Sequence, residues 1–434
     1  MYKVAFITLG CKVNQYETNA MIQKFKEQGY NILEHTKKAD IYIINTCTVT
    51  NMSDRKSRQM LRRVKDLNPQ AIVVACGCYA QVAKEELEEI EEIDLILGNN
   101  EKKEIVNYIE KYLDDKKKIQ STEDVMQTRE LVDFGDVTYT EKTRAVIKVQ
   151  DGCDRFCSYC IIPYARGRVR SRKPESVISE IENIAKEGIK EVVITGIHVA
   201  SYGKDFADNY RLIDLLEEIN QIEGIKRIRL GSIEPLLIDE DFISRLTKLE
   251  KICHHFHLSL QSGCDETLKR MNRRYTTKEF EKIVNLLREK YNDVILTTDI
   301  IVGFPGETEE EFNKTYDFLK KIKFYKMHVF KYSQRKGTKA NSMPMQIDGN
   351  IKEIRSQKLI ELSDINEIEY NKTYTGKEVD VLFEERKDGF YKGHTKNYIL
   401  VYLPEQDILK KNIENKIVNV KCVNYSNNYI LATL

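Results

Sequence analysis

The sequence predicts an α/β protein in three parts: an N-terminal parallel α/β domain, a central partial (β/α)6 barrel and a small C-terminal β-barrel. Along most of the chain, short apolar runs alternate with polar helical stretches, the pattern of parallel βα units. The end of the chain instead shows β-type alternation without intervening helices. With 434 residues, the chain can bury two or three separate cores. We therefore expect domains at residues 1–113, 143–370 and 371–434, with a linker at residues 114–142.

The first domain has apolar runs that read as strands, with helical patterns between them. The predicted strands are residues 2–8, 40–45, 71–75 and 94–97, and the predicted helices are residues 14–27, 54–67 and 81–90. The polar, charged stretch that follows shows no convincing periodicity beyond a short strand near Val137, which is why it is assigned as the linker.

The central domain repeats the βα pattern over a longer span. Its predicted strands are residues 144–149, 191–195, 227–230, 256–260, 293–299 and 326–332, and its predicted helices are residues 174–186, 210–219, 276–290 and 308–320. Six strands favour a partial barrel over a closed one of eight. The C-terminal strands are predicted at residues 378–383, 389–394, 398–403 and 417–423, and a barrel of this size often binds nucleic acid.

Composition limits the partners and the compartment. The 69 basic and 68 acidic residues give no whole-chain attraction for nucleic acid, so any RNA would bind through local patches. No apolar stretch approaches the roughly 20 residues that a membrane helix needs, and no cleavage site follows the first apolar run. The ten cysteines are too few for a disulfide scaffold in a chain of this size. Their clustered spacing is typical of metal ligands in a reducing compartment. We therefore expect a cytoplasmic protein without a membrane partner.

Cys153, Cys157 and Cys160 form a C-x3-C-x2-C run directly after the first predicted barrel strand. Three thiolates on one loop can hold three corners of a cubane iron-sulfur cluster and leave one iron open for chemistry. Such an iron can chelate the amino and carboxylate groups of S-adenosylmethionine (SAM) and deliver an electron to its sulfonium. The alternative is a structural zinc site, but such sites are closed by four ligands, and the nearest histidine, His198, lies a strand away.

Cys11, Cys47 and Cys78 form a second set in the N-terminal domain, and each follows the end of a predicted strand. Loops at the carboxyl edge of a parallel sheet converge, so we expect the three thiols to meet and to bind metal. The alternative is that they are inert buried thiols. Cys76 competes with Cys78 but reads as a core residue. The remaining cysteines read as structural: Cys253, Cys264 and Cys422.

These motifs carry a family resemblance. The C-x3-C-x2-C loop resembles that of the radical SAM superfamily, in which the three cysteines bind a 4Fe-4S cluster. The two cysteine sets in this order, followed by a β-domain, closely resemble the methylthiotransferase family across essentially the whole chain. The resemblance implies a radical SAM partial barrel, a terminal RNA-binding barrel of the TRAM type, and a second 4Fe-4S cluster on Cys11, Cys47 and Cys78 that carries the transferred sulfur.

The opening residues LGCKVNQYE resemble the branch that adds a methylthio group to C2 of N6-threonylcarbamoyladenosine next to the tRNA anticodon. The resemblance implies two uses of SAM: one methylates a sulfur on the N-terminal cluster, and another yields the deoxyadenosyl radical that activates C2. It also implies tRNA, an electron donor such as flavodoxin or ferredoxin, and a sulfur source as partners. The alternatives are the isopentenyladenosine branch, the ribosomal-protein branch and a non-catalytic zinc-dependent RNA-binding protein.

Residues at the ends of the barrel strands are candidates for binding SAM. Gly196 would let backbone approach a cofactor, or could simply serve a turn. Arg273 matches a family motif whose arginine reaches the SAM carboxylate, a task that suits a guanidinium. Asp299 begins a segment that lies near SAM in members of the family. The other candidates are Tyr159, Ser232, Glu234, Ser259 and Gln261.

Two basic stretches are candidates for RNA contact. Phosphate binding is the natural use of the dense run just past the cluster loop, which contains Arg166, Arg168, Arg170 and Arg172, although a solvated surface loop would look the same. In the last domain, basic and aromatic residues alternate as in RNA binders that stack bases: Tyr391, Lys392, His394 and Lys396.

Three nearby histidines, His254, His255 and His257, raise the question of a metal site. They fall on a predicted strand, where successive side chains face opposite sides. The sequence therefore favours packing roles for them over shared metal binding.

Overall fold

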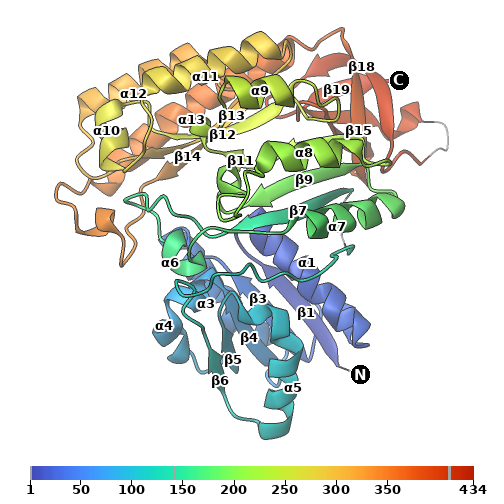
Figure 1. Ribbon diagram of the computed structural model, residues 1–434, viewed down its shortest axis with the longest axis vertical. Helices are drawn as coiled ribbons and strands as arrows, with labels where there is room; N and C mark the ends of the chain where they lie inside the picture. The colour runs from blue at the N-terminus through green and yellow to red at the C-terminus, as the bar shows by residue number, and fades with distance from the viewer. Residues whose placement is uncertain (1, 140–142, 409–411) are drawn as a thin grey trace.

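The computed structural model describes residues 2–139, 143–408 and 412–434. In Figure 1 the N-terminal domain forms the lower part of the molecule, and the central domain lies above it. The C-terminal barrel lies beside the central domain. The end of the predicted linker, residues 140–142, lies outside the described residues.

The N-terminal domain is a parallel sheet in the order β2-β1-β3-β4-β5-β6. Its strands are β1 (Lys3–Thr8), β2 (Asn31–Leu33), β3 (Ile41–Thr46), β4 (Ile72–Gly77), β5 (Leu95–Leu97) and β6 (Ile119–Ser121). Its helices are α1 (Lys12–Glu27), α2 (Asn51–Leu67), α3 (Cys78–Val82), α4 (Lys84–Glu88) and α5 (Ile105–Asp115). Helices cover both faces, so every residue of β3 and β4 is buried, as their unbroken apolar sequence predicts.

Four strands of this domain were predicted correctly, and four features were not. The helix α5 was not predicted. The predicted helix at residues 81–90 is two short helices, α3 and α4. The edge strand β2 is short and only partly buried, so it gave no apolar signal. The edge strand β6 lies inside the segment predicted as a linker and pairs with β5. Part of the linker therefore belongs to the first sheet.

The central domain contains the six predicted strands in one curved layer, divided by hydrogen bonding into two sheets. The strands are β7 (Arg144–Asp151), β8 (Arg170–Ser171), β9 (Glu191–Gly196), β10 (Arg227–Leu230), β11 (Ser232–Ile233), β12 (His255–Gln261), β13 (Ile295–Val302) and β14 (Lys326–Lys331). The orders are β10-β9-β7-β8 and β11-β12-β13-β14, and a single bridge between Ile228 and Ile252 spans the gap from β10 toward β12. This is the expected partial (β/α)6 barrel with two added short strands.

Helices pack on the convex side of this layer, where a continuous apolar core lies between strands and helices. They are α7 (Pro174–Lys186), α8 (Leu212–Gln221), α9 (Glu240–Leu246), α10 (Asp265–Arg270), α11 (Thr277–Lys290), α12 (Glu309–Ile322) and α13 (Gly349–Lys372). The short helix α6 (Ile162–Arg166) lies instead against α3 of the N-terminal domain. Capping boxes start α11 at Thr276 and α12 at Thr308, which explains why both were predicted closely. The long helix α13 was not predicted.

The C-terminal domain is a closed barrel in the order β15-β16-β17-β19-β18. Its strands are β15 (Glu378–Lys387), β16 (Phe390–Thr395), β17 (Leu400–Pro404), β18 (Ile417–Tyr425) and β19 (Ile430–Thr433). Four were predicted, and the short closing strand β19 was not. Side chains alternate in and out along β16 and β17, which fills the barrel with one apolar core.

Tyr398 joins the C-terminal barrel to the central one. Its ring centroid lies 4.3 Å from the Arg229 guanidinium and 5.1 Å from that of Arg144, and it stacks on His394 at 4.5 Å. Arg229 is buried and pairs with Glu191 at 2.7 Å. These residues lie near the amino ends of β7, β9 and β10, so the C-terminal barrel docks at the end of the central barrel opposite the cysteine loop.

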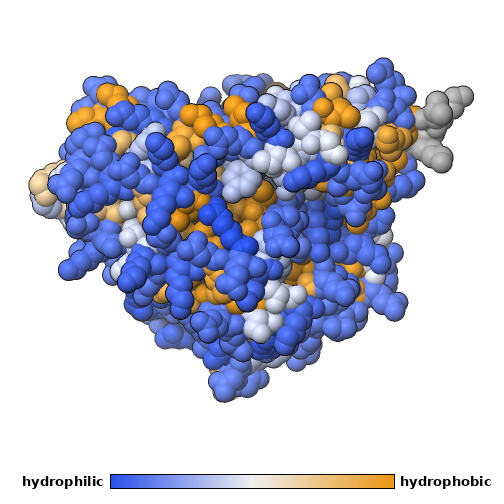
Figure 2. Space-filling model, turned by 90° about the horizontal axis from the view of Figure 1, so that it is seen from above, coloured by the Kyte–Doolittle hydropathy of each residue, from blue (hydrophilic) through white to orange (hydrophobic). Residues whose placement is uncertain are grey.

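The surface is mostly polar. No helix among the described residues is long and apolar enough to cross a membrane. The face in Figure 2 is dominated by hydrophilic side chains, with apolar residues only in patches between them.

Replacing Tyr398 with alanine should weaken this junction. The change removes a partly buried aromatic ring and its contacts with two guanidinium groups, so we expect about 2 kcal/mol less free energy of unfolding. Urea unfolding measures the change, and Tyr2→Ala, at an exposed tyrosine, is the control. If both substitutions lowered the free energy of unfolding equally, Tyr398 would not stabilise the junction between the barrels.

Candidate functional site

Cys11, Cys47 and Cys78 follow three neighbouring strands at one edge of the N-terminal sheet. Cys11 lies just past β1 and precedes α1, Cys47 comes directly after β3, and Cys78 begins α3 after β4. The strands β1, β3 and β4 are adjacent and parallel. Gly10 lies against Cys47, since a Cβ on Gly10 would be 2.8 Å from the Cys47 Sγ. The loops therefore converge as the sequence predicts.

The electrostatics of these thiols reflect their proximity. Burial, together with the Cys78 and Cys11 thiols, raises the pKa of Cys47 to about 11. Burial also raises the pKa of Cys11, and Cys78 adds to the effect, while Arg166 opposes it. Cys11 itself is reachable by solvent, so it lies in a recess rather than in the core. A metal that bound such thiols would bind them as thiolates and release their protons.

Cys76 points away from this group. It is fully buried in the apolar core between the sheet and the helices α1 and α5, and its thiol is directed toward the Ile44 carbonyl oxygen at 3.7 Å. This supports the prediction that Cys76 is a core residue.

The second cysteine set lies on the loop after β7. The Cys153 N–H donates to the Gly167 carbonyl at 3.0 Å, and the Cys160 N–H donates to the Cys157 carbonyl at 2.9 Å. Burial, with the Cys157 thiol, raises the pKa of Cys153 to about 11 and that of Cys160 to about 12. The Ser158 N–H donates to the Met271 carbonyl at 3.0 Å, which fixes the loop against the motif that contains Arg273.

The spacing of the thiols bears on which metal they suit. Four-coordinate zinc holds its thiolates roughly 4 Å apart, because each Zn–S bond is about 2.3 Å long. Within residues 2–139, 143–408 and 412–434, neither cysteine set has its sulfur atoms within 4.8 Å of one another. In this conformation neither set therefore has the close spacing of a tetrahedral zinc site.

Arg166 connects the two cysteine sets. It ends α6, the short helix that follows Cys160, and its side chain is fully buried. Its Nε donates to the Cys78 Sγ at 3.1 Å. Asn99 adds a second link, because its Nδ2 donates to the Ala165 carbonyl at 2.7 Å and lies 3.8 Å from the Cys78 Sγ. The segment after the barrel loop thus contacts the N-terminal set directly.

Around Arg166 lies a buried ion network that crosses the domain boundary. The Glu17 carboxylate accepts from Lys102 at 2.6 Å, from Lys148 at 2.6 Å and from Arg166 at 2.5 Å. Lys148 also pairs with Asp151 at 2.6 Å. Burial alone would raise the pKa of Glu17, but the three cations outweigh burial and hold it well below its usual range. Glu17 therefore stays charged inside the protein.

This network corrects the prediction for the basic run. Arg166, Arg170 and Arg172 are at most 2% exposed. Arg170 donates to the Arg166 carbonyl at 2.6 Å, and Arg172 pairs with Glu180 at 2.5 Å. Phosphate contact is therefore wrong for these three arginines, because their guanidinium groups serve internal ion pairs and hydrogen bonds.

The remaining basic candidates differ in access. Arg168 is exposed and lies 4.9 Å from the Phe156 ring centroid on the cysteine loop. Lys392 is partly exposed beside the Tyr402 ring, at 5.0 Å. Lys396 instead donates to the Glu250 carbonyl at 2.6 Å, so it helps to dock the C-terminal barrel. Contact with RNA stays a prediction for Arg168 and Lys392, and contact through Lys396 would require breaking this bond.

Several predicted SAM-binding residues gather beside the barrel loop. The Arg273 guanidinium donates to the Cys157 Sγ at 3.4 Å and to the Ser259 carbonyl at 3.1 Å, and it lies 3.9 Å from Glu234. Burial raises the pKa of Glu234, but His198, Arg273 and Arg155 together hold it at about 2. An arginine and a carboxylate thus lie beside the cysteine loop. Together they could bind the carboxylate and the ammonium of an amino-acid group.

The other candidates are spread around this point. Gly196 lies where a Cβ would be 2.8 Å from the Gln150 Oε1, so close backbone packing requires glycine there. Tyr159 packs near Phe304, with ring centroids 6.5 Å apart. Ser232 is exposed, and Gln261 ends β12 with a φ of 72°. Asp299 lies beside His257 instead, 3.2 Å from its Nε2. SAM contact stays a prediction for all of them.

Sequence reasoning missed the residues that join the domains. Arg335, beyond β14, donates to Thr48 Oγ1 at 2.5 Å and pairs with Asp54 at 2.5 Å, next to Cys47. No local pattern marks Arg335. Lys148 offered a signal, since a lysine in the middle of a buried apolar strand needs a partner.

Comparison with known proteins agrees with this geometry. Residues 147–319 match the Radical SAM superfamily, and residues 3–98 match the uncharacterized protein family UPF0004. The chain is 42% identical to the threonylcarbamoyladenosine tRNA methylthiotransferase MtaB of Bacillus subtilis, covering 96% of this chain and 94% of that protein. It is 43% identical to the MtaB of Aquifex aeolicus, covering 92% and 95%.

More distant proteins share function or fold. The tRNA-2-methylthio-N(6)-dimethylallyladenosine synthase of Caldicellulosiruptor saccharolyticus is 36% identical, with 96% of this chain and 86% of that protein covered. Among solved structures, the radical S-adenosylmethionine methyltransferase TsrM from Kitasatospora setae, with cobalamin and a 4Fe-4S cluster, aligns with a TM-score of 0.58 at 16% identity. That alignment covers 79% of this chain and 77% of TsrM, and it supports the fold alone.

Replacing Arg166 with alanine should destabilise the interface between the domains. Glu17 would keep its two lysines but lose the guanidinium, and a broken buried ion pair costs about 3 kcal/mol. Urea unfolding of the cluster-free protein measures the loss. The matched control is Arg168→Ala, two residues along and exposed, for which we expect less than about 0.5 kcal/mol. A small effect of Arg166→Ala would contradict a structural role for the network.

Proposed function

Because the chain belongs to the radical SAM family of tRNA methylthiotransferases, we propose that it adds a methylthio group to C2 of N6-threonylcarbamoyladenosine next to the tRNA anticodon. The observation that carries this function is the pair of cysteine sets, placed at two sheet edges and linked through Arg166. The relatives named for threonylcarbamoyladenosine match at higher identity than the one named for dimethylallyladenosine, which favours this base.

Membership of the superfamily implies SAM and a 4Fe-4S cluster, and the cysteines fit such a group. We assign the SAM-cleaving cluster to Cys153, Cys157 and Cys160, because three ligands leave one iron open. We assign a second cluster to Cys11, Cys47 and Cys78, whose thiols lie in a recess near the positive Arg166. When bound, the first cluster would supply the electron that cleaves SAM, and the second would supply the sulfur.

The residues around the first set have clear tasks in this proposal. Arg273, held by the Ser259 carbonyl, would bind the SAM carboxylate, and Glu234 would bind its amino group. Glu234 stays ionised at neutral pH, since its pKa is about 2. Positioning by such fixed charges, rather than proton transfer, is what the protein contributes.

Arg166 would act on the second set. Its guanidinium, 3.1 Å from the Cys78 sulfur, stabilises negative charge there and offers a hydrogen bond to sulfur. The same side chain is fixed by Glu17, so the positive charge cannot move away.

We further propose that tRNA approaches past Arg168 and is held in part by the C-terminal barrel through Lys392. A low-potential reductant such as flavodoxin or ferredoxin and a separate sulfur source would complete the reaction, and we place the enzyme in the cytoplasm with its tRNA. The isopentenyladenosine and ribosomal-protein substrates are the alternatives that the tests must separate.

Iron analysis tests the two assignments. Anaerobically reconstituted wild type should hold about eight irons with matching acid-labile sulfide, since each cysteine set binds one four-iron cluster. The triple variants Cys153→Ala/Cys157→Ala/Cys160→Ala and Cys11→Ala/Cys47→Ala/Cys78→Ala should each lose about half. Cys76→Ala is the control and should lose none. Zinc in place of iron, or an unchanged iron content in the N-terminal variant, would refute the proposal.

Product analysis tests the substrate. In a strain lacking this gene, mass spectrometry of tRNA nucleosides should show N6-threonylcarbamoyladenosine without its methylthio form, and expression of the wild-type chain should restore it. Both triple variants should fail to restore it. If the lost mark is instead on isopentenyladenosine or on a ribosomal protein, the substrate assignment is wrong while the reaction class stands.

A further inference from the structure

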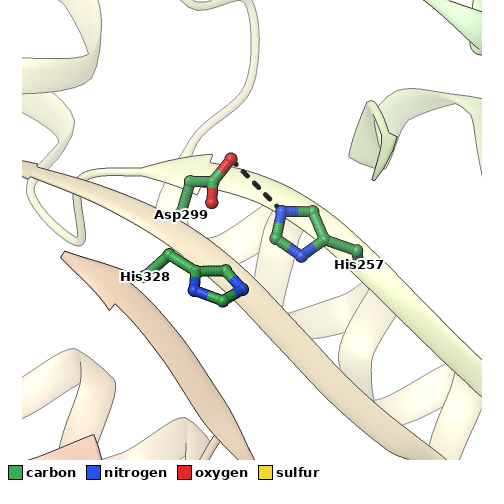
Figure 3. Close-up of side chains that lie close together, drawn as sticks. All are labelled: His257, Asp299 and His328. Atoms are coloured by element: carbon green, nitrogen blue, oxygen red, sulfur yellow. Dashed lines mark ion pairs between the residues drawn. The ribbon is translucent and has the colours of Figure 1, made fainter. Parts of the chain in front are cut away.

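Away from the cysteines, three metal-ligating side chains meet on neighbouring strands. His257 lies on β12, Asp299 on β13 and His328 on β14, and their ligand atoms all lie within 4.8 Å of one another. The Asp299 carboxylate is 3.2 Å from the His257 Nε2, and the two imidazole rings lie roughly parallel with centroids 5.8 Å apart. Figure 3 shows the three side chains converging from the three strands.

The group faces the inside of the partial barrel. The neighbours of His257 along β12, Phe256 and Leu258, belong to the apolar core beneath the outer helices. Since side chains alternate along a strand, His257 points to the opposite, concave side. Asp299 and His328 are direct partners across β13 and β14 and lie between core residues in the same way.

The orientation of His257 is that of a metal ligand. Its Nδ1 is hydrogen-bonded to Thr297 Oγ1 at 3.0 Å, which fixes the ring. Its Nε2 is buried and lies 3.2 Å from an Asp299 oxygen, an ion-pair contact that does not form a hydrogen bond. Ligating histidines are held in this manner, with one ring nitrogen anchored and the other free for the metal.

A simple ion pair explains this arrangement less well. A charged His257 donating to Asp299 would satisfy Nε2, yet that bond is not formed. A metal ion between the side chains would use the unpartnered nitrogen, the carboxylate and His328 at once. A buried polar atom without a hydrogen bond is costly, and a nitrogen that faces both a carboxylate and a second imidazole is well placed to bind a metal ion.

We propose that His257, Asp299 and His328 bind one divalent transition-metal ion. Two imidazoles and one carboxylate suit zinc, cobalt, manganese or ferrous iron better than magnesium or calcium. Three protein ligands leave at least one coordination position open toward the barrel interior, where water or a carboxylate oxygen can bind. The site contains no cysteine and so uses none of the proposed cluster ligands, and it stands whether or not the proposed substrate is right.

Cobalt binding to the full-length, cluster-loaded protein tests the site. After dialysis against a chelating resin, the protein is equilibrated with Co²⁺, and bound cobalt is counted alongside iron. Wild type should bind one equivalent of cobalt without losing iron. X-ray absorption at the cobalt edge should show nitrogen and oxygen neighbours with imidazole scattering and no sulfur shell.

Variants locate the ion. His328→Ala is the decisive change, because His328 is exposed and its loss should not affect folding, whereas Asp299 is also a candidate for SAM contact. His328→Ala and His257→Ala should each weaken cobalt binding at least about tenfold. The matched control is His254→Ala, since His254 pairs with Asp293 elsewhere and should leave binding unchanged.

Three results would overturn the proposal. The first is that wild type binds no cobalt after equilibration with Co²⁺ and removal of the free ion. The second is a sulfur shell around the bound cobalt, which would place it on cysteines. The third is unchanged cobalt affinity in His328→Ala.

Discussion

The structure depends on one buried carboxylate, that of Glu17. It lies on α1, immediately after the first cysteine loop, and draws Lys102 from its own domain and Lys148 and Arg166 from the barrel domain to a single point. Each of these cations would be prohibitively costly to bury alone. Their shared anion therefore fixes how the two domains pack, because neither domain can move away without leaving charges unpaired in a dry interior.

That constraint has a chemical consequence. The domains are held with the carboxyl edge of one parallel sheet next to the loop at the carboxyl end of another, and Arg166 spans the join to reach Cys78. The proposed reaction, with two clusters, would need its parts at fixed separation, since a misplacement of about 1 Å can cost 100-fold in rate. An interface held by buried ion pairs fixes this separation, because ion pairs and their hydrogen bonds are directional and apolar contacts are not.

Much of this could be predicted from the sequence, and the failures share a cause. The converging loops of Cys11, Cys47 and Cys78 follow from strand order, a local property of parallel sheets. The edge strand β6 and the helix α13 lack a strong apolar pattern, so their signal lies only in tertiary contacts. The basic run was misread because burial of an arginine depends on a partner far away in sequence: Glu17 precedes Arg166 by 149 residues.

The burial of those arginines also limits which residues of the basic run can contact RNA. With Arg166, Arg170 and Arg172 turned inward, Arg168, beside Phe156, is the arginine of the basic run that stays exposed. An arginine next to an aromatic ring can pair with a phosphate and support a stacked base, which suits a single unstacked nucleotide more than a duplex backbone. The charge balance of the chain fits this view, because a nearly neutral protein has little long-range attraction for RNA and depends on local contacts.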